Sequence, residues 1–314
     1  MSETKTLDPS QAVRLQTYLN ATSESPEPVS PIDKRRARRS FERAAQTYDS
    51  VAVLQREIAD RMLERLDYVR LRPERILDIG TGTGYAIDWL TRRYPKARVV
   101  ALDFAHGMLG QARRRGSWMR RPLCVCADAE QLPLADASVD LIVSNATFQW
   151  CNDLERTFRD CLRILRPGGL FMFTTFGPDT LRELRAAWSQ VDAHSHVSPF
   201  LDMHDIGDTL ARVRFADTVM DAERLTLTYD RVQDLMRDLK VLGAHNATSQ
   251  RPRALTGRAR IRALEAAYEA HRSDGRLPAS YEVVYGHAWA PVQTETAEGV
   301  AIPVSALGGR KGGS

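Results

Sequence analysis

Short, continuous apolar runs alternate along this chain with longer segments in which apolar residues recur every three or four positions. The short runs are bounded by turn residues, as in strands buried on both faces, whereas the longer period is that of an amphipathic helix. Strands alternating with helices are typical of an α/β fold. The predicted strands are Ile76–Ile79, Ala97–Leu102, Leu123–Cys126, Val139–Val143, Leu170–Thr175, Glu223–Tyr229 and Tyr281–Ala288.

Helical periodicity fills the intervals between these runs and also precedes the first one. It begins near Phe41, with Tyr48 falling near the same helix face. Lys34–Arg39 is a basic run that opens this helix, either as a solvated end or as a binding element. The Asp153–Leu165 helix stops at Pro167-Gly168-Gly169, a combination that ends helices. The other predicted helices are Met203–Arg212, Arg231–Leu242 and Ala254–His271.

The segment RILDIGTGTGY, residues 75–85, joins the first buried strand to a helix through a glycine-rich turn. Glycines let the backbone approach a ligand closely, and the helix amides beyond them point at that ligand. Phosphate-binding and dinucleotide folds use a similar turn. Asp78 is more informative, because this carboxylate would repel a pyrophosphate but suits an ammonium group, such as that of S-adenosylmethionine. The alternative is that the segment is only a tight turn and that Asp78 has no role in binding a ligand.

The carboxyl ends of the next three strands carry side chains suited to parts of one nucleoside ligand. Asp103 ends the second strand, where a carboxylate accepts hydrogen bonds from both hydroxyls of a ribose. Met108 follows on a helix and suits an adenine face, and Asp128, after the third strand, suits the adenine amino group. Asn145 ends the fourth strand beside the glycine turn. Each acid alone is more often a helix cap or a solvated loop end, so the prediction depends on all four strand ends together.

Taken in order, these strand ends resemble those of class I S-adenosylmethionine-dependent methyltransferases, over about residues 40–290. The resemblance implies a Rossmann-like α/β fold with a seven-stranded, mostly parallel sheet and helices on both faces. It also implies a helical lid, inserted after strand 5 and between strands 6 and 7, and S-adenosylmethionine as the cofactor. The implied cofactor-binding residues are Asp78, Gly80, Thr81, Gly82, Gly84, Asp103, Phe104, Met108, Asp128, Ala129 and Asn145.

Composition narrows the class of protein further. A chain of 314 residues with 43% apolar content suits one elaborated domain. No apolar run approaches the ~18–20 residues that cross a bilayer, and the N-terminus lacks a secretory pattern, so we expect no membrane insertion. Cysteines without CxxC spacing, including Cys124 and Cys126 in one strand, indicate core thiols and a cytoplasmic location. A formal net charge of +4 does not indicate a nucleic-acid-binding protein.

We expect three segments along the chain. Residues 1–33 are polar and proline-containing, which predicts a disordered leader. Residues 34–291 form the methyltransferase domain, with lid elements at about 34–68, 177–200 and 231–275, and residues 292–314 form a flexible tail. The histidines of the inserted loop, His194 and His196, lack a third ligand at a recognisable spacing, which favours a polar lid over a metal site.

Three segments are more specific than the glycine turn. They are SNATFQWCNDL (144–154), FTTFGPDTLRELRAAWSQVDAH (173–194) and LMRDLKVLGAHN (235–246). These segments, together with Phe41–Gln55, resemble the malonyl-acyl-carrier-protein O-methyltransferases of biotin synthesis. The resemblance implies methyl transfer to the free carboxyl of malonyl-acyl-carrier protein, or of malonyl-CoA, which primes pimeloyl synthesis.

In the methyltransferase family an N-terminal segment with a Tyr-Asp pair folds over the cofactor, which makes Tyr48 and Gln55 candidates for closing the pocket. A malonyl carboxylate has a pKa of about 4 and needs no general base, so no catalytic residue is assigned. The candidates for positioning the substrate are Tyr48, Gln149, Trp150 and His196. Tyr48 and Trp150 are alternatively core residues. The candidates for substrate or carrier binding are Arg182, Arg237, Lys240, Arg258 and Arg262. Solvated helix faces are the alternative for these basic residues.

Two other functions stay open. FGPDTLREL and HVSPF also resemble a mitochondrial complex I assembly factor that is built on this fold and linked to arginine hydroxylation. Arg237 and Lys240 favour the carboxylate-using enzyme over that rival. A quinone or phenol methyltransferase would need a base near the sulfonium, a role open to His194 or His196. Carrier protein or coenzyme A preference and the oligomeric state also stay open.

Overall fold

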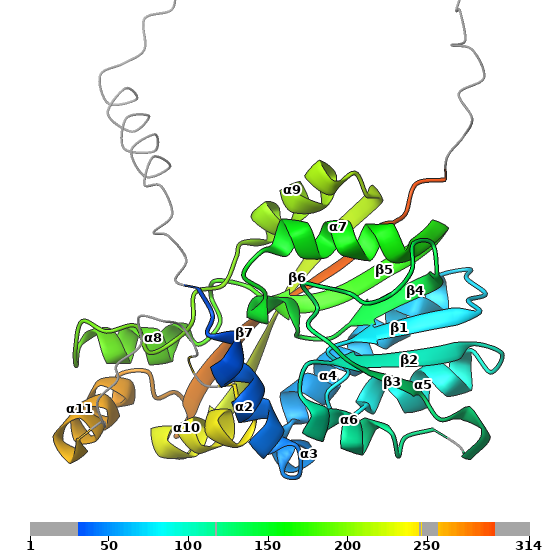
Figure 1. The fold of residues 1–314 in the computed structure, drawn as a ribbon. Helices are drawn as coiled ribbons and strands as arrows, with labels where there is room; N and C mark the ends of the chain where they lie inside the picture. Colours follow the sequence, from blue (N-terminus) through cyan, green and yellow to red (C-terminus); the bar gives the residue numbers. More distant parts are fainter. Residues whose placement is uncertain (1–30, 117, 245, 247–256, 293–314) are drawn as a thin grey trace, which may run out of the picture.

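A computed structural model of the chain describes residues 31–116, 118–244, 246 and 257–292. Its centre is a seven-stranded sheet with the order β3-β2-β1-β4-β5-β7-β6 (Figure 1). The strands are β1 (Arg75–Ile79), β2 (Arg98–Asp103), β3 (Leu123–Cys126), β4 (Val139–Ser144), β5 (Leu165–Phe176), β6 (Ala216–Tyr229) and β7 (Leu277–Trp289). The strands β1 to β5 pair in parallel, and β7 runs antiparallel to β5 and β6. The predicted seven-stranded, mostly parallel sheet is confirmed.

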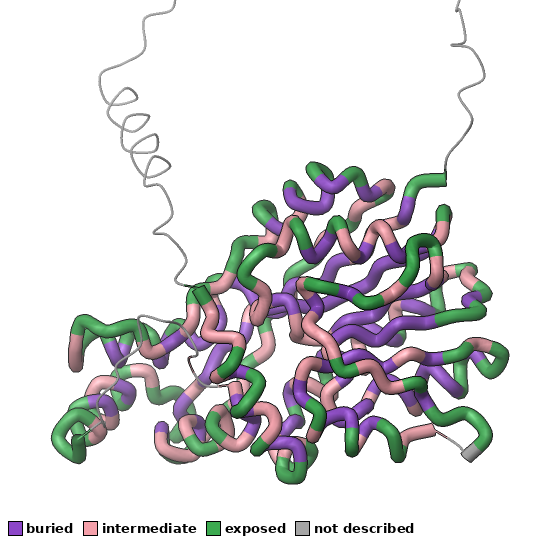
Figure 2. The backbone as a smooth tube through the Cα atoms, in the orientation of Figure 1, coloured by how far each residue is buried: buried purple, intermediate pink, exposed green. Residues whose placement is uncertain are grey.

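Helices cover both faces of this sheet, because successive side chains of a strand point to opposite faces. Ile76 of β1 packs in one core with Ile58 and Ile87, whereas its neighbour Leu77 packs in a second core with Phe158. Figure 2 shows the buried residues concentrated in the sheet. The helices are α2 (Lys34–Ala44), α3 (Tyr48–Val51), α4 (Val53–Glu64), α5 (Tyr85–Arg93), α6 (His106–Ala112), α7 (Leu154–Ile164), α8 (Arg182–Ser189), α9 (Met203–Val213), α10 (Val232–Val241) and α11 (Arg258–Glu269).

The inserted helices gather at one end of the molecule. Figure 1 shows α8, α10 and α11 there, beside α2 and α3 from the N-terminal segment. Contacts join α11 to α8 and α10 to α3, so segments far apart in the sequence enclose one region. The lid elements predicted after β5 and between β6 and β7 therefore lie next to the N-terminal ones. No helix within the described ranges is long and apolar enough to cross a membrane.

Several predicted boundaries differ from the structure. The helix predicted to reach Leu165 ends at Ile164, and β5 begins immediately, so the Pro-Gly-Gly segment lies inside a strand. Gly168 has a φ of +76°, and its N–H donates to the Ala290 carbonyl at 2.9 Å. Pairing with the chain after β7 therefore overrides the local helix-stop signal. β6 also begins earlier than predicted, at Ala216, because it pairs with β7 along its length.

The structure also changes two expectations about single residues and termini. The sequence predicts a disordered leader that includes Ile32 and Asp33, yet the Ile32 N–H donates to Asn152 Oδ1 at 2.7 Å and Asp33 caps α2. Residues 1–30 and 293–314, and the predicted start of α11 at 254–256, lie outside the described residues. Cys126 is exposed rather than a core thiol, because β3 is an edge strand.

Candidate active site

The glycine-rich turn after β1 has the backbone conformation that its sequence predicts. Gly80, Gly82 and Gly84 have φ values of +67°, +55° and +82°, in the left-handed region that favours glycine. A Cβ at Gly80 would lie 2.1 Å from Thr147 Oγ1, so only glycine fits there. The turn thus packs against the loop after β4 and leaves a hollow at the carboxyl edge of the sheet, where α/β sheets bind ligands.

Asp78 is a buried carboxylate at the end of β1. Only 3% of the residue is exposed, and its Oδ2 accepts a hydrogen bond from Thr81 Oγ1 at 2.6 Å. Burial raises the pKa of Asp78 to about 7; the Thr81 hydrogen bond opposes this shift and the Asp103 carboxylate adds to it. A positively charged ligand group would stabilise the ionised form.

Asp103 lies at the end of the neighbouring strand β2. Its Oδ1 accepts from the Ala105 N–H at 2.8 Å and its Oδ2 from the Gly82 N–H at 3.0 Å, which fixes the carboxylate against the glycine turn. Burial raises the pKa of Asp103 to about 6, against the effect of these two hydrogen bonds. Each oxygen retains a second lone pair, so the group can still accept from a diol.

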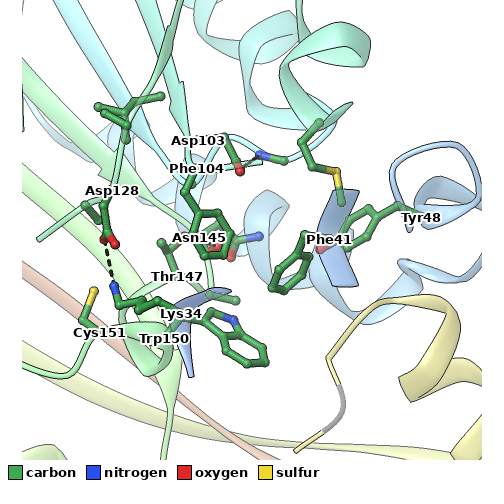
Figure 3. Close-up of a pocket in the computed structure, with 17 residues that line it drawn as sticks. Lys34, Phe41, Tyr48, Asp103, Phe104, Asp128, Asn145, Thr147, Trp150 and Cys151 are labelled. Carbon is green, nitrogen blue, oxygen red and sulfur yellow. Dashed lines mark hydrogen bonds and ion pairs between the residues drawn. The ribbon is translucent and has the colours of Figure 1, made fainter. Parts of the chain in front are cut away.

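The third predicted strand end, at Asp128, forms the far side of the same hollow. Asp128 Oδ1 accepts from Lys34 Nζ at 2.8 Å, an interaction between α2 and the loop after β3 (Figure 3). Met108 is 1% exposed and packs beside Phe104 and Phe41 in a small apolar cluster. An apolar slot with a carboxylate at its end is therefore present where the sequence places an adenine ring.

Three adjoining cavities open around this sheet edge. The strand-tip cavity, of about 590 Å³, is lined by Asp103, Phe104, Met108, Asp128 and Ala129, among others (Figure 3). The glycine-turn cavity, of about 460 Å³, is lined by Asp78, Gly80, Thr81 and Gly82 together with residues of α3 and α4. The lid cavity, of about 1240 Å³, is enclosed by the inserted helices and is lined by Gln149, Trp150 and His196.

Tyr48 lines all three cavities. The next residue, Asp49, fixes the segment that carries it: Asp49 accepts from Thr83 Oγ1 at 2.6 Å and pairs with Arg115 at 2.8 Å. Burial raises the pKa of Tyr48 well above its usual value, with Asp103 and Asp49 adding to the shift, so its hydroxyl stays a neutral donor. Tyr48 is thus a cavity residue and Asp49 anchors its segment, whereas the closing role of Tyr48 and Gln55 stays a prediction.

The polar residues after β4 are used largely by the protein itself. Asn145 donates to the Gln55 carbonyl at 2.9 Å and accepts from Thr174 Oγ1 at 2.7 Å, so its side chain holds α4 against β5. Gln149 donates from Nε2 to the Ala146 carbonyl at 2.7 Å and accepts from a threonine hydroxyl of β5. Both residues line cavities, and each side chain keeps one N–H and one acceptor lone pair for a ligand.

The other two substrate candidates are aromatic neighbours of the lid cavity. Trp150 packs edge-on against Phe41, with ring centroids 5.2 Å apart, and both line the strand-tip and lid cavities. His196 stacks on Trp188 at 3.6 Å and shares a hydrogen bond of 2.9 Å with Asp192. All four predicted substrate-positioning residues therefore line the lid cavity.

The predicted basic residues lie elsewhere, since none of the five lines the lid cavity. Arg182 is half-exposed beside Glu183, at 3.2 Å, and Arg237 pairs with Asp234 at 2.7 Å on the outer side of α10. Lys240, Arg258 and Arg262 are exposed. Among the described residues, no cluster of three or more His, Cys, Asp or Glu could hold a metal ion.

Sequence reasoning left some cavity residues unassigned. Lys34, Thr147 and Cys151 line the strand-tip cavity, and Phe41 lines both this cavity and the lid cavity. Lys34 is the first residue of the basic run, and the others lie in the segments 144–154 and Phe41–Gln55, which indicate the family but assign these residues no role. Thr147 contacts Ile79, and Phe41 contacts Phe104 and Trp150, so these contacts join distant segments of the chain, which no local pattern reveals.

Comparisons with known proteins agree with this geometry. Residues 77–173 match the family model described as a methyltransferase domain. A putative methyltransferase from Bacillus halodurans C-125 shares the fold, with a TM-score of 0.54 at 17% identity over 74% of this chain and 99% of that chain. The fold and the site define a class I methyltransferase that uses S-adenosylmethionine.

Two relatives narrow the class. The malonyl-[acyl-carrier protein] O-methyltransferase of Methylovorus sp. (strain MP688) is 54% identical over 83% of this chain and 90% of its own length. That of Gallionella capsiferriformans (strain ES-2) is 52% identical over 86% of this chain and 96% of its own length. The chain belongs to the malonyl-[acyl-carrier protein] O-methyltransferase family, as the sequence segments predict.

The residues present fit S-adenosylmethionine. Its sulfonium carries three substituents, and three cavities meet at Tyr48. The glycine-turn cavity holds Asp78, a buried acid suited to the methionyl ammonium, and the strand-tip cavity holds Asp103 and Asp128, suited to ribose and adenine. The lid cavity adjoins both of these cavities at Tyr48.

Proposed function

We propose that this protein transfers the methyl group of S-adenosylmethionine to the free carboxylate of a malonyl group carried as a thioester on acyl carrier protein. The observation that carries the proposal is the family membership, since relatives named for this reaction are 52–54% identical to the chain. These relatives do not favour the quinone or assembly-factor alternatives. The methyl ester would then serve as a primer for pimeloyl synthesis in the biotin pathway.

Methyl transfer from a sulfonium is an in-line displacement, so the protein's main task is to bring the acceptor oxygen to about 3 Å from the methyl carbon. A carboxylate with a pKa of about 4 arrives ionised, so no residue has to remove a proton. The carboxylate supplies the electron pair of the new C–O bond, and the C–S bond electrons return to sulfur. Tyr48 lines all three cavities and therefore adjoins both partners.

The lining of the lid cavity suits a weakly held carboxylate. Among its described residues, His196 is the side chain that can carry a positive charge, and the wall is otherwise neutral and largely apolar. A tight guanidinium clamp would stabilise the ground state and slow the displacement. Neutral donors such as the Tyr48 hydroxyl orient an anion without that penalty, and apolar walls of α8 and α10 suit an extended thioester arm.

The five basic candidates are proposed as contacts for the carrier protein rather than for the malonyl group. These residues lie on α8 and α10, which line the lid cavity, and on α11, which packs against α8: Arg182, Arg237, Lys240, Arg258 and Arg262. Acyl carrier proteins are acidic, and exposed basic residues steer acidic partners electrostatically. A carrier protein docked on these helices would bring its prosthetic arm, which carries the malonyl thioester, next to the lid cavity.

The test is transfer of labelled methyl from S-adenosylmethionine to malonyl-carrier, compared with malonyl-CoA, succinyl-carrier and a quinone precursor. We expect malonyl-carrier to be the preferred acceptor. The turnover number at saturating substrates should stay flat from about pH 6 to 8, because no base titrates in that window. Preferred methylation of the quinone precursor, with a rate that rises through a histidine-like pKa, would overturn the proposal.

A further inference from the structure

Lys34, the first residue of α2, is held at the adenine end of the strand-tip cavity by two carboxylates. Its Nζ lies 2.8 Å from Asp128 Oδ1 (Figure 3). It also lies 2.9 Å from Glu130 Oε2. The side chain is 22% exposed. Burial works to lower the pKa of Lys34, but Cys151 and the two carboxylates outweigh it, and the pKa lies above its usual value. The ammonium is therefore charged at neutral pH.

The two carboxylate oxygens of Asp128 differ in the hydrogen bonds that they accept from the protein. Oδ1 accepts from Lys34 Nζ and also from the Glu130 N–H at 3.1 Å. Among the described residues, no hydrogen bond reaches Oδ2. Because Oδ1 is bound on two sides, the carboxylate plane is fixed, and Oδ2 is left to accept from a ligand in the cavity that Asp128 lines.

The backbone around Lys34 does not depend on these ion pairs. Ile32 donates to Asn152 Oδ1 at 2.7 Å and accepts from Asn152 Nδ2 at 3.2 Å. Asp33 caps α2 by accepting from the Arg36 N–H at 3.0 Å. Further along, Glu42 accepts from the Gly107 N–H of α6. Other residues thus attach the segment before and after Lys34. The Lys34 side chain is therefore not needed to hold the segment in place.

We propose that Lys34 is a positioning residue for the adenine ring of the cofactor. Its ammonium fixes the Asp128 carboxylate so that Oδ2 accepts a hydrogen bond from the exocyclic amino group of adenine. The residue thereby determines how strictly the enzyme recognises adenine, without touching the reacting atoms. The proposal rests on S-adenosylmethionine as the cofactor and is independent of which acceptor is methylated.

The test compares two ligands that differ at the adenine 6-position: S-adenosylhomocysteine, which carries an amino donor, and S-inosylhomocysteine, which carries a carbonyl. Calorimetry gives both affinities. The wild type should prefer the adenosyl ligand by about tenfold or more, because hydrogen bonds to charged acceptors are strong. Lys34→Met keeps the unbranched stem of the side chain and removes the ammonium, and the preference should fall below about threefold.

If Lys34 has only a structural role, the result is different. Replacing it would then weaken the binding of both ligands equally and leave the preference between them unchanged. Arg35→Met, at the next and exposed position, is the matched control and should keep the wild-type preference. Lys34→Arg keeps a positive charge and should retain part of the preference for the adenosyl ligand. Lys34→Gln gives a second neutral variant if Lys34→Met does not fold.

The final arm is a double-mutant cycle. Asp128→Asn should abolish the preference, and adding Lys34→Met to it should change nothing further, because the two residues act as one unit. A wild-type preference retained in both neutral Lys34 variants, or absent from the wild type itself, overturns the proposal. No acyl substrate enters any of these measurements, so their failure would leave the proposed function untouched.

Discussion

Two buried carboxylates dominate the electrostatics at the scale of single residues. Asp78 and Asp103 end adjacent strands, and burial raises their pKa values to about 7 and about 6. Because both pKa values are raised in the folded chain, ionising these groups costs stability as pH rises through them. A bound ligand with an ammonium group and a ribose diol favours the ionised forms and reverses that cost.

Cofactor binding should therefore release protons near neutral pH. We expect the affinity for S-adenosylmethionine to fall by about tenfold or more between pH 8 and pH 5.5. Calorimetry at pH 6.5 in two buffers of different ionisation enthalpy measures the protons released. Asp103→Asn should remove part of the pH dependence and weaken binding. A pH-independent affinity would contradict the assignment of both carboxylates to the cofactor.

Gln55 gives a second prediction at this scale. Its Oε1 is buried without a hydrogen-bond partner among the described residues, and it lines the glycine-turn and lid cavities. An unsatisfied buried acceptor costs about 1–3 kcal/mol, which a donor on a ligand can offset. Gln55→Met should leave the ligand-free protein as stable as the wild type, or more so, and weaken cofactor binding about fivefold to tenfold.

Thermal denaturation without ligand and calorimetry with S-adenosylmethionine separate the two effects of Gln55→Met. Gln46→Met, at an exposed position just after α2, is the control and should change neither. Loss of stability with unchanged cofactor affinity would show that the Gln55 amide has a structural role only.

At the scale of elements, one buried side chain joins the lid to the sheet. Glu183 of α8 is 6% exposed and accepts from the Ser280 N–H at 3.0 Å and the Ser280 hydroxyl at 2.5 Å, both on β7. Burial works to raise the pKa of Glu183, but the Ser280 hydrogen bonds outweigh it and the pKa is lowered. The ionised carboxylate therefore fixes one wall of the lid cavity.

The hydrogen bonds between Glu183 and Ser280 predict a contribution to the free energy of unfolding that is lost at acidic pH. Since the pKa of Glu183 is lowered on folding, its contribution is complete above the unfolded pKa of about 4.3 and is lost as pH falls through the folded value. Glu183→Gln should lower the free energy of unfolding by about 1–3 kcal/mol at pH 7, and by less near pH 3. Chemical denaturation at both pH values measures this. Glu64→Gln, at an exposed position, is the control, and an equal loss at both pH values would contradict the argument.

At the scale of the whole molecule, charge distribution matters more than the modest net charge of +4. Arg258 and Arg262 lie one turn apart on the exposed side of α11, beside the lid cavity formed by α8 and α10. Exposed charges act over about 8 Å at physiological ionic strength. Docking of an acidic carrier on this surface should therefore weaken as salt is added.

Reversing both arginines to glutamate should raise the KM for malonyl-carrier about tenfold at low salt and leave the KM for malonyl-CoA unchanged. Lys96→Glu with Arg98→Glu makes the same change in net charge at the amino end of β2 and should affect neither substrate. An equal loss on both substrates would make the effect structural, and the docking assignment would be dropped.

Much of the fold and of the candidate cofactor site was predictable from the sequence, because the determining signals are local. A buried strand, a glycine turn and an acid at the strand end lie within a few residues, and parallel strands place such ends at one edge. Asp78, Asp103 and Met108 therefore lie where the pattern places them. The family resemblance was equally readable from short segments, and it is confirmed.

The tertiary structure alone decided how side chains are shared between distant segments. Lys34 meets Asp128 across 94 positions, Asn145 is used to hold Gln55 and Thr174, and the Pro-Gly-Gly segment continues a strand because Ala290 pairs with it. No periodicity encodes such contacts, since each depends on how helices and strands pack. The sequence by itself determined the sheet, the strand ends and the family. Packing determined which of the polar residues remain available to a ligand.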